Sequence, residues 1–316
     1  MKLVIAGGTG FLGSPLAEVH AEEGHEVRVL TRSLSPGEAR HEPGTGVPGI
    51  TKVGWNPTSS DTNATSALGM AISDVDVVVN LAGASIGDGR WTPQRKAQLR
   101  DSRIVPTRVL ANAIAESANP PKVLISASGA GYYGASGAEP KTEDSPAGDD
   151  FLAHLCADWE SEALRAARGG TRVVLMRAGV VLERSGGALP KMMPPFRFFA
   201  GGPLGSGRQY MSWLHRLDYI EMVRWIVDTP AVEGPINATA PYPVTNREFA
   251  KALGRAMRRP AMLPAPAVAL KLMLGPERAE ALLLTGQRAV PAKALAHGYH
   301  FRYPEIDIAM RGIFGE

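Results

Sequence analysis

A glycine-rich turn at the start of the chain constrains its fold more than any other feature. The segment LVIAGGTGFLG is an aliphatic run that enters closely spaced glycines and leads directly into an amphipathic stretch, Phe11 to Glu23. Gly7 and Gly10 would allow a tight turn close to a pyrophosphate, and Gly13 would let the helix pack on the sheet. Free N–H groups at the helix start would face the phosphate charge. This context predicts a dinucleotide-binding unit, the alternative being a purely structural turn.

The end of the second predicted strand indicates which dinucleotide would bind. Where NAD is used, a carboxylate at this point holds the ribose hydroxyls. Here the strand Glu26 to Leu30 is followed by Thr31, Arg32 and Ser33, without a carboxylate. A guanidinium beside hydroxyl groups offers donors to a 2′-phosphate. We therefore predict NADP(H) rather than NAD, the alternative being that Arg32 is a solvated loop residue.

The first half of the chain alternates short aliphatic runs with amphipathic stretches, the pattern of a parallel sheet wound with helices. Several runs lack polar alternation, as expected for strands covered on both faces. The predicted strands are Lys2 to Ala6, Glu26 to Leu30, Ile50 to Gly54, Asp76 to Leu81, Lys122 to Ser126 and Arg172 to Met176. The predicted helices are Phe11 to Glu23, Arg95 to Arg100 continuing toward Ser117, and Phe151 to Ala167. The fold class is therefore α/β, with a doubly wound parallel sheet of the NAD(P)-binding Rossmann type.

Breaking signals interrupt this pattern at two places. Pro106 lies within a predicted helix and indicates a break or a first helical turn. The stretch Leu34 to Pro48 is rich in Gly, Pro and Glu and has no apolar period, so we expect a surface loop.

The second half has a different texture. Residues 186–209, GGALPKMMPPFRFFAGGPLGSGRQ, are rich in Gly and Pro around Met and Phe, which favours an irregular lid over a cleft. Further helices are predicted near Tyr219 to Asp228, Asn246 to Met257 and Ala267 to Thr285. We expect a Rossmann domain over residues 1–181, with sheet elements recurring to about 240. Residues 182–316 would form the lid and a smaller, mostly helical substrate and C-terminal lobe.

Composition and charge exclude several classes of partner. The 316 residues carry a formal net charge of +3, and the basic residues form no run with interleaved aromatics, so nucleic-acid binding is not expected. The chain has one cysteine, which excludes an internal disulfide framework and argues against a structural metal site. No apolar run approaches the roughly 20 residues that span a bilayer. These features predict a cytoplasmic protein with a small-molecule substrate, no metal and no membrane partner, and they leave a homodimer open.

The fourth predicted strand also ends in residues that suit a cofactor. It runs into Asn80, Leu81, Ala82 and Gly83, small residues at the strand's carboxyl end, where ligands bind in such sheets. Arg103, on the following helix, is spaced to return toward the same edge.

The motifs together resemble a known family. AGGTGFLG, NLAG, RW followed by SR, SASGAGYYG, RAGVVL, GGPLGSGRQYMSWLH and NATAPYPVTNREF are similar, in this order, to the epimerase-like atypical branch of the extended short-chain dehydrogenase/reductases. LLLTGQRAVPAKALAHGYHFRYP resembles the small C-terminal domain of unknown function that ends members of that branch. The resemblance implies NADP(H), with contacts carried over onto Gly10, Phe11, Leu12, Thr31, Arg32, Leu81, Ala82, Arg103 and Val181. The predicted cofactor set adds Gly7, Thr9, Gly13 and Gly83.

The chain departs from the family's usual catalytic pattern. Short-chain dehydrogenases commonly use a Ser or Thr with a Tyr-x-x-x-Lys pair, in which the Lys lowers the Tyr pKa. Ser128 lies in the right region for the hydroxyl, but Leu152 and Cys156 stand where Tyr and Lys are expected. Tyr132 and Tyr133 are candidates to substitute, with packing as the alternative for at least one. Cys156 is read as a small buried residue in preference to a nucleophile.

Two other segments carry polar residues of open function. His215 and Asp218, in SWLHRLD, either act near the substrate or position the junction between the lobes, and the second reading is preferred for His215. Arg90 and Trp91 either face a planar or anionic substrate or stack on each other. No G-x-S-x-G elbow leads from strand to helix, which argues against an acyl hydrolase.

Two functional hypotheses remain. The first is an NADP(H)-dependent oxidoreductase or epimerase for a small organic substrate, in which Ser128 with Tyr132 or Tyr133 orients the substrate oxygen. The second is a regulatory or sensor protein that binds NADP(H) without turnover, which the missing Tyr-x-x-x-Lys pair supports.

Overall fold

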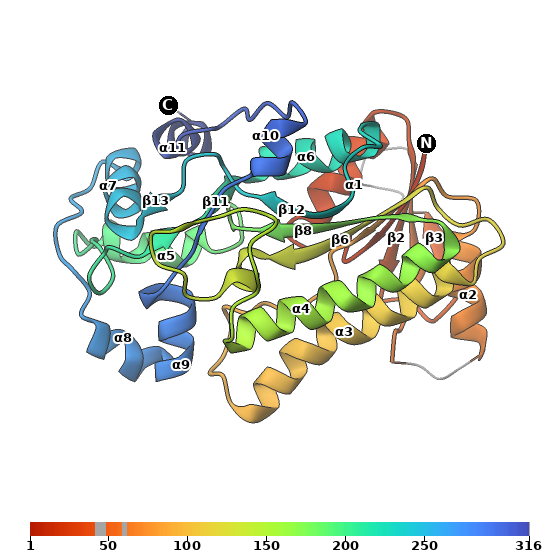
Figure 1. Ribbon diagram of the computed structural model, residues 1–316, viewed down its shortest axis with the longest axis horizontal. Helices are drawn as coiled ribbons and strands as arrows, with labels where there is room; N and C mark the ends of the chain where they lie inside the picture. The colour runs from red at the N-terminus through yellow and green to blue at the C-terminus, as the bar shows by residue number, and fades with distance from the viewer. Residues whose placement is uncertain (42–48, 59–61, 316) are drawn as a thin grey trace.

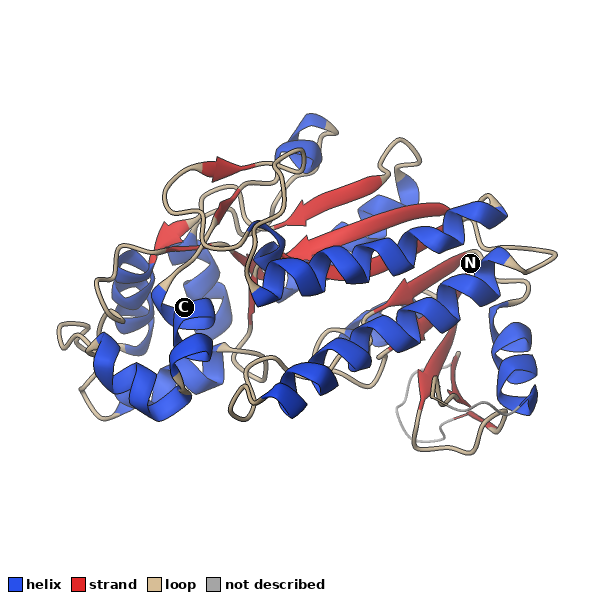
Figure 2. Ribbon diagram, turned by 60° about the horizontal axis from the view of Figure 1, so that its bottom comes forward, coloured by secondary structure: helices blue, strands red, loops and turns tan. Residues whose placement is uncertain are grey.

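The computed structural model describes residues 1–41, 49–58 and 62–315. A central, mostly parallel sheet is covered by helices on both faces, and a mainly helical C-terminal region lies at one end of it (Figures 1 and 2). The predicted fold class is confirmed.

Eight strands among the described residues form the central sheet, in the order β12-β8-β6-β5-β1-β2-β4-β3. All neighbours pair in parallel except β3 with β4. Their bounds are β1 Lys2–Ala6, β2 Glu26–Thr31, β3 Ala39–His41, β4 Ile50–Gly54, β5 Val77–Asn80, β6 Val123–Gly129, β8 Arg172–Ala178 and β12 Gly234–Ala238. Three small sheets pair β7 Pro140–Lys141 with β14 Arg288–Ala289, β9 Val180–Leu182 with β11 Trp213–His215, and β10 Tyr210–Met211 with β13 Val244–Thr245.

The strand order fixes where a ligand can bind. The chain winds outward from β1 through β2 to β4, and then returns to β5 on the other side of β1. The strand order therefore reverses between β1 and β5, and the connections after these strands diverge there. In open α/β sheets, ligands occupy the crevice at the carboxyl ends of the strands at this switch point.

The helices divide between the two faces of the sheet and the C-terminal end. Figures 1 and 2 show α2, α3 and α4 on one face and α1 and α6 on the other. Their bounds are α1 Gly13–Glu22, α2 Thr62–Ile72, α3 Pro93–Ala115, α4 Phe151–Ala163, α5 Leu189–Arg197, α6 Arg216–Asp228, α7 Asn246–Met257, α8 Ala267–Leu274, α9 Pro276–Ala279, α10 Ala292–Ala296 and α11 Ile306–Phe314. Shorter turns are the 3-10 helices η1 Ala130–Tyr133 and η2 Leu164–Gly169 and the π-helix η3 Glu280–Leu284.

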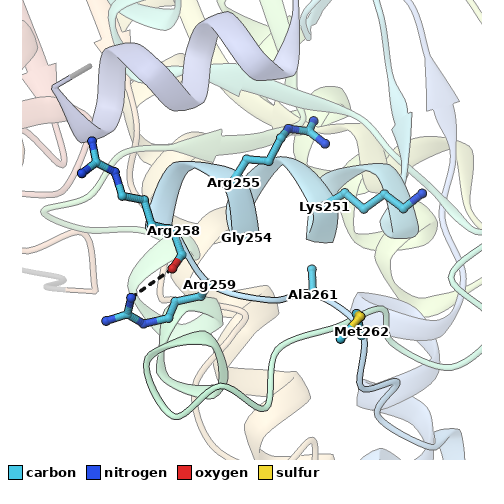
Figure 3. Close-up of a pocket in the computed structure, with 7 residues that line it drawn as sticks. All are labelled: Lys251, Gly254, Arg255, Arg258, Arg259, Ala261 and Met262. Atoms are coloured by element: carbon cyan, nitrogen blue, oxygen red, sulfur yellow. Dashed lines mark hydrogen bonds between the residues drawn. The ribbon is translucent and has the colours of Figure 1, made fainter.

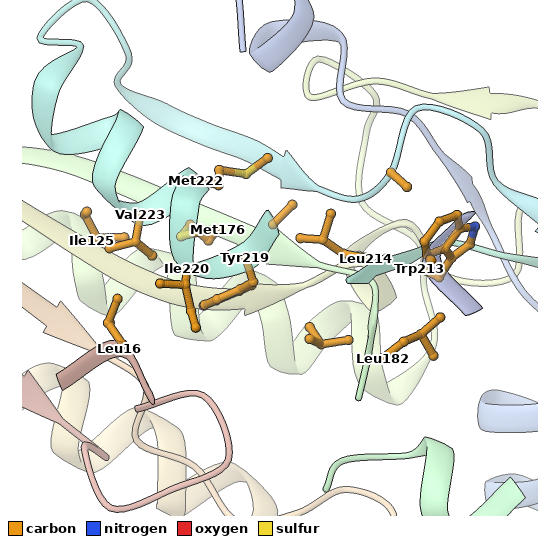
Figure 4. Packing of buried hydrophobic residues seen from close by; sticks show 14 of the residues in the cluster. Leu16, Ile125, Met176, Leu182, Trp213, Leu214, Tyr219, Ile220, Met222 and Val223 are labelled. Carbon is orange, nitrogen blue, oxygen red and sulfur yellow. The ribbon is translucent and has the colours of Figure 1, made fainter. Parts of the chain in front are cut away.

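A large apolar core joins the two halves of the chain. Figure 4 shows Ile220 and Val223 of α6 among the same buried side chains as Leu16 of α1 and Ile125 of β6. The cluster continues into α7 and α11, so the C-terminal helices share the core that covers one face of the sheet. None of the helices in the described part of the chain combines the length and apolar character needed to cross a bilayer.

The helix break predicted at Pro106 is wrong. Helix α3 runs without interruption from Pro93 to Ala115, and Pro106 lies buried inside it. An interior proline removes a hydrogen bond and costs about 3 kcal/mol. Burial of Leu99, Ile104 and Leu110 on the same helix offsets that cost, because each contributes about 1.5–3 kcal/mol when removed from water.

Two predicted irregular segments contain regular structure. Strand β3 forms within the stretch expected to be a loop, where it pairs antiparallel with β4, while residues 42–48 of that stretch lie outside the described residues. The expected lid contains helix α5. Prolines are tolerated in the first turn of a helix, and burial of Met193 and Phe196 compensates for those further along. The helix predicted over Ala267 to Thr285 is divided into α8, α9 and η3 at Gly275.

Candidate cofactor and substrate site

The glycine turn has a shape that only glycine allows. Gly7 has a φ of 79°, and an added Cβ would lie 2.8 Å from the Leu81 carbonyl carbon. At Gly13, an added Cβ would lie 2.3 Å from the Gly7 carbonyl oxygen. The turn is closed by a 3.0 Å hydrogen bond from the Gly10 amide to the same oxygen. The backbone after β1 thus packs directly on the backbone after β5, at the switch point.

The start of α1 is open to an anion. Leu12 occupies the N-cap position, where no side chain accepts a hydrogen bond from the helix, and the first turn holds no acidic residue. Thr9 and Gly10 are exposed, and Phe11 and Leu12 are half-buried. Uncapped N–H groups and the helix dipole favour negative charge at such a terminus. The turn and the helix start are therefore compatible with a bound pyrophosphate.

A buried network holds the backbone that follows β5. The side-chain Nδ2 of Asn80 donates to the hydroxyl of Thr107 at 2.7 Å. Its side-chain Oδ1 accepts from the backbone amide of Ala82 at 3.3 Å. Trp159 also donates to the Thr107 hydroxyl, at 2.8 Å. These bonds fix the path of residues 81–83 beside Gly7. The backbones of these residues and of Gly7 pack closely, which explains why small residues stand at this strand end.

Arg103 returns to the same edge, as its spacing indicates. Its guanidinium donates to the carbonyl oxygens of Ala84 at 2.8 Å and Leu99 at 3.0 Å, and an added Cβ on Gly83 would lie 3.2 Å from its central carbon. Burial lowers the pKa of Arg103, and no carboxylate pairs with it among the described residues. A half-buried cation whose partners are carbonyls, the Ser102 hydroxyl and the Trp159 ring, and not a carboxylate, retains its positive charge at this edge.

The end of β2 presents a cation to solvent. Thr31 is buried, and its hydroxyl lies 2.9 Å from that of Ser33. Arg32 is exposed and has no hydrogen bond or ion pair in the part of the chain that the structure describes. Its guanidinium is therefore available to a ligand that lies along the carboxyl ends of β1 and β2.

The predicted lid reaches back to the glycine turn. Added Cβ atoms on Gly186 and Gly187 would lie 2.6 and 2.8 Å from the ring of Phe11, so this loop packs on the turn residue. The Gly187 position also lies 3.3 Å from the carbonyl oxygen of Val181. Phe11 and Val181, which are far apart in the sequence, thus both lie beside Gly187.

The three candidate catalytic residues surround a buried ion pair that the sequence did not indicate. Arg177 of β8 donates from Nε and Nη2 to the two carboxylate oxygens of Glu160 on α4, both at 2.9 Å. The two side chains are 4% and 8% exposed. Burial opposes the charge on Arg177, but Glu160 more than offsets this and raises the pKa of Arg177. Ser128 donates to Glu160 at 2.7 Å, so its proton is already engaged.

The two tyrosines differ in availability. The Tyr133 hydroxyl donates to Asn237 at 2.7 Å and accepts from Arg177 at 3.1 Å, and burial raises the pKa of Tyr133 to about 12. Tyr132 is half-buried, and Arg177 lies 3.4 Å from its ring centroid. No hydrogen bond of the Tyr132 hydroxyl occurs among the described residues. Tyr132 is therefore the candidate whose hydroxyl is left for a ligand.

Leu152 and Cys156 offer no group that could act as an acid or base. Leu152 packs against Gly131, where an added Cβ would lie 3.2 Å from the Cβ of Leu152. Cys156 is buried beside Gly129, and burial together with the charge of Glu160 raises the pKa of Cys156 to about 11. A thiol with a raised pKa is a poor nucleophile. The structure thus favours the reading of Cys156 as a small buried residue.

His215 and Asp218 hold the junction with the C-terminal segment. Nδ1 of His215 accepts from the Leu217 amide at 3.1 Å at the start of α6, and its ring stacks on Tyr303 at 3.9 Å. The Asp218 carboxylate accepts from the amides of Arg302 at 2.7 Å and Tyr303 at 3.0 Å. Burial lowers the pKa of His215 to about 4. These contacts support the structural reading of His215.

The loop of residues 85–90 is fastened to the C-terminal region. Arg278 of α9 donates to the carbonyl oxygens of Gly87 and Gly89, and Arg90 donates to that of Leu272 at 3.2 Å. Trp91 packs edge-on against Phe151 with centroids 5.3 Å apart, so no stack of Arg90 on Trp91 is found here. Trp91 is buried by its contact, whereas Arg90 is exposed and uses one Nη atom in its bond to Leu272.

Sequence reasoning missed the polar residues that organise this site. Four buried polar residues are connected here: Glu160, Arg177, Glu143 and Asn237. The backbone amide of Asn237 donates to the Glu143 carboxylate at 3.0 Å. Arg177 had a visible signal, since it follows four consecutive apolar residues near the end of strand β8. The other three are ordinary polar residues whose proximity depends on the fold. A group of His20, Glu23 and His25 that could hold a metal ion lies near the carboxyl end of α1, so it is remote from the glycine turn.

Comparisons with known proteins give a consistent result. Residues 3–239 match the model of the NAD dependent epimerase/dehydratase family, and residues 265–313 match a domain of unknown function, DUF1731. An epimerase family protein of Mycobacterium leprae (ML0860) is 41% identical over 98% of this chain and 94% of its own length. The crystal structure of the human epimerase family protein SDR39U1 with NADPH has a TM-score of 0.86 at 35% identity, covering 100% of both chains. That of a nucleoside-diphosphate sugar epimerase from Corynebacterium glutamicum has a TM-score of 0.74 at 31% identity and covers 100% of this chain and 58% of that one.

Proposed function

Because this chain belongs to the NAD dependent epimerase/dehydratase family, we propose that it binds NADP(H) and catalyses an oxidoreductase or epimerase reaction on a small organic molecule. The membership confirms the resemblance in the motifs, and the DUF1731 match confirms its C-terminal part. The human relative that was crystallised with NADPH supports the choice of coenzyme.

The observation that carries the proposal is the backbone cradle at the switch point. The positions of Gly7 and Gly13 admit no Cβ, and α1 begins without a capping side chain. A cradle of this kind suits a pyrophosphate, because the backbone approaches closely and the helix start supplies donors. The proposed cofactor contacts are Gly7, Thr9, Gly10, Phe11, Leu12, Gly13, Thr31, Arg32, Leu81, Ala82, Gly83, Arg103 and Val181.

Selectivity for the phosphorylated coenzyme would rest on Arg32. Charge-assisted hydrogen bonds contribute about 1.5–3 kcal/mol. We therefore expect Arg32→Ala to weaken NADPH binding about 10- to 100-fold and to leave NADH binding nearly unchanged. Fluorescence titration with each coenzyme measures this. Arg168→Ala, at another exposed arginine, is the matched control. Equal losses for both coenzymes would contradict the assignment.

The reaction itself would use few side chains. NADP(H), when bound, supplies or accepts a hydride. Tyr132 is the candidate to contact a substrate oxygen, whereas Ser128 and Tyr133 would act as positioning residues through Glu160 and Arg177. The similarity to a nucleoside-diphosphate sugar epimerase supports a sugar nucleotide as one substrate class. The single cysteine, in its reduced form, is consistent with the proposed cytoplasmic location.

A second candidate function is NADP(H) binding without turnover. The specific observation in its favour is that both hydroxyl groups donate hydrogen bonds within the protein, that of Ser128 to Glu160 and that of Tyr133 to Asn237. A regulatory protein would need only the cradle, and binding would then set a conformation.

One experiment separates the two functions. Purified protein is mixed with NADPH and a panel of carbonyl compounds, and NADPH oxidation is followed by absorbance. Because epimerisation consumes no net coenzyme, a panel of sugar nucleotides is incubated separately with the protein and NADP⁺, and formation of an epimer is followed by NMR. An enzyme should turn over at least one compound, and Tyr132→Phe should reduce kcat while NADPH still binds. Tight NADPH binding with neither oxidation nor epimer formation would favour the regulatory function.

A further inference from the structure

Exposed apolar side chains concentrate at one end of the molecule. Of the twelve large hydrophobic residues that are exposed in the described part of the chain, seven lie in two segments, 198–199 and 262–273. Phe198 is 81% exposed, Met262 79% and Leu272 74%. Scattered surface hydrophobics need no explanation, but a concentration of them marks an interaction site.

The two segments are in contact with each other. The Leu263 amide donates to the Gly201 carbonyl oxygen at 3.1 Å, and the Arg259 guanidinium lies 4.6 Å from the ring centroid of Phe199. Figure 1 shows α7 and α8 at the same end of the molecule, joined by the connection between them. We refer to Phe198, Phe199, Met262 and Leu263 as the apolar tip.

Strong positive charge accompanies the apolar tip. Residues 184–217 contain five Lys and Arg and no Asp or Glu, and residues 249–276 likewise contain five and none. Removing these ten leaves 24 basic against 31 acidic side chains, so the rest of the chain carries a net charge of −7 although the whole chain carries +3. The excess of basic residues in the sequence therefore lies in the two segments that include the apolar tip, where Lys191, Arg216, Arg255 and Lys271 form ion pairs with acidic residues from outside them.

Basic side chains also line a depression beside the apolar tip. It has a volume of about 440 Å³, and its polar lining comes from Lys251, Arg255, Arg258 and Arg259, with Met262 at its edge (Figure 3). Arg255 is paired with Asp307 at 2.6 Å, so its charge is partly neutralised within the depression. The cations thus flank the exposed apolar side chains instead of being dispersed over the surface.

In contrast to the expectation from the sequence of no membrane partner, we propose that the apolar tip and its basic rim dock on the surface of a membrane that contains anionic phospholipids. Apolar side chains flanked by Lys and Arg fit the boundary between head groups and acyl chains. A second copy of the chain is disfavoured as the occupant, because it would bring two basic rims together. Exposed fractions up to 81% describe side chains that stand free of their neighbours, which a bilayer accommodates without a matching groove.

The backbone at Phe199 supports a role for its side chain. Phe199 has a φ of 60°, in the left-handed region, just after the end of α5. Glycine is the residue that a helix end prefers there, and a bulky residue in this region costs about 1–3 kcal/mol. The chain therefore displays an aromatic ring at a position where it destabilises the fold.

Vesicle flotation with the full-length protein tests the proposal. Phosphatidylcholine vesicles are compared with vesicles that also contain phosphatidylserine, at low and high salt. We expect binding to the phosphatidylserine vesicles and a loss of it at high salt. Phe198→Ser with Phe199→Gly, and separately Lys251→Glu with Arg259→Glu, should each weaken binding by about tenfold or more.

Matched controls separate docking from folding. Met70→Ser and Arg168→Glu change an equally exposed hydrophobic and an exposed arginine outside the two segments, and should leave vesicle binding unchanged. Phe199→Gly alone should not lower the melting temperature, because it relieves the left-handed backbone. All variants should keep NADPH affinity, so failure of this proposal is distinct from failure of the proposed function.

Three results would overturn the proposal. The first is no flotation of the wild-type protein with phosphatidylserine vesicles. The second is flotation that both double variants retain. The third is that the protein binds polyglutamate, a probe for an acidic protein partner, through the same residues but does not bind vesicles.

Discussion

At the scale of single residues, the candidate site is organised around a buried ion pair. Glu160 of α4, one turn beyond Cys156, engages Arg177 and Ser128. Because a charged pair at 4% and 8% exposure requires its partners to stay in place, this network fixes the residues around it. Glu160 and Arg177 thus hold their neighbours in fixed positions, and the Tyr132 hydroxyl remains available to a ligand.

We predict that Arg177→Met lowers the free energy of unfolding by about 3–5 kcal/mol, because Glu160 is then a buried charge without a partner. The double variant Arg177→Met with Glu160→Leu should recover much of this loss. Arg100→Met, which breaks a pair with Asp158 at 50% exposure on both sides, should cost at most about 1 kcal/mol. Urea denaturation measures all three, and equal losses for Arg177→Met and Arg100→Met would contradict the account.

Histidine burial predicts a loss of stability in acid. The pKa of His215 is lowered by burial to about 4, whereas an unfolded histidine has a pKa of about 6.5. Below pH 6.5 the unfolded chain therefore binds the additional proton, and stability falls as the pH decreases toward 4. His215→Asn keeps a capping acceptor at this helix start without the titration.

The His215→Asn variant should lose about 2 kcal/mol less stability than the wild-type protein between pH 7 and pH 5. Chemical denaturation at the two pH values measures the difference. His20, whose pKa burial also lowers to about 4, should contribute a similar slope in both proteins, which makes it an internal reference. A wild-type protein and variant with the same pH dependence would contradict the assignment to His215.

Among single residues, those close together in the sequence could be assigned to the site, and those that only the fold brings together could not. The glycine turn, Arg32 and the residues after β5 each lie within one short segment of the chain, directly after a predicted strand, so their chemistry can be read from local sequence. Glu160, Arg177 and Asn237 come from α4, β8 and β12, and only the sheet topology brings them together. Their role could not be predicted from spacing, although the charge of Arg177 after four consecutive apolar residues was a usable signal.

At the scale of elements, the parallel strands and the helices with a clear apolar period were predictable. Strand β1 and helix α7 have the predicted bounds. Two of the failures involve proline. Pro106 did not interrupt α3, and the prolines of α5 did not prevent a helix, because tertiary burial outweighed the local penalty. Local rules therefore hold wherever packing does not override them.

Asp218 illustrates how one element holds another. It lies on α6, and its carboxylate accepts the amides of Arg302 and Tyr303, which precede α11. We predict that Asp218→Ala leaves these buried amides unpaired, at a cost of about 1–3 kcal/mol each. Amide hydrogen exchange should then accelerate in residues 299–314, while β1, β2 and β5 remain protected.

The control for this prediction is Asp307→Ala. It removes a surface ion pair with Arg255 on the same C-terminal segment and should leave exchange in residues 299–314 nearly unchanged. If Asp218→Ala also left that exchange unchanged, Asp218 would not be the attachment point of the segment.

At the scale of the whole molecule, the two halves of the chain meet around the carboxyl edge of the sheet. β14 pairs with β7, Glu143 accepts the amide of Lys293 at 3.2 Å, and Arg278 holds the loop of residues 85–90. The C-terminal region therefore completes the surroundings of the switch point, where the cradle for a dinucleotide lies.

The central claim is that a phosphorylated nicotinamide dinucleotide rests on the turn between β1 and α1. Isothermal titration calorimetry of the wild-type protein, with NADPH and with NADH in separate experiments, tests it most directly. We predict one NADPH site per chain, with an affinity about tenfold or more above that for NADH, since Arg32 meets the additional phosphate. Absence of binding by both coenzymes would contradict the claim.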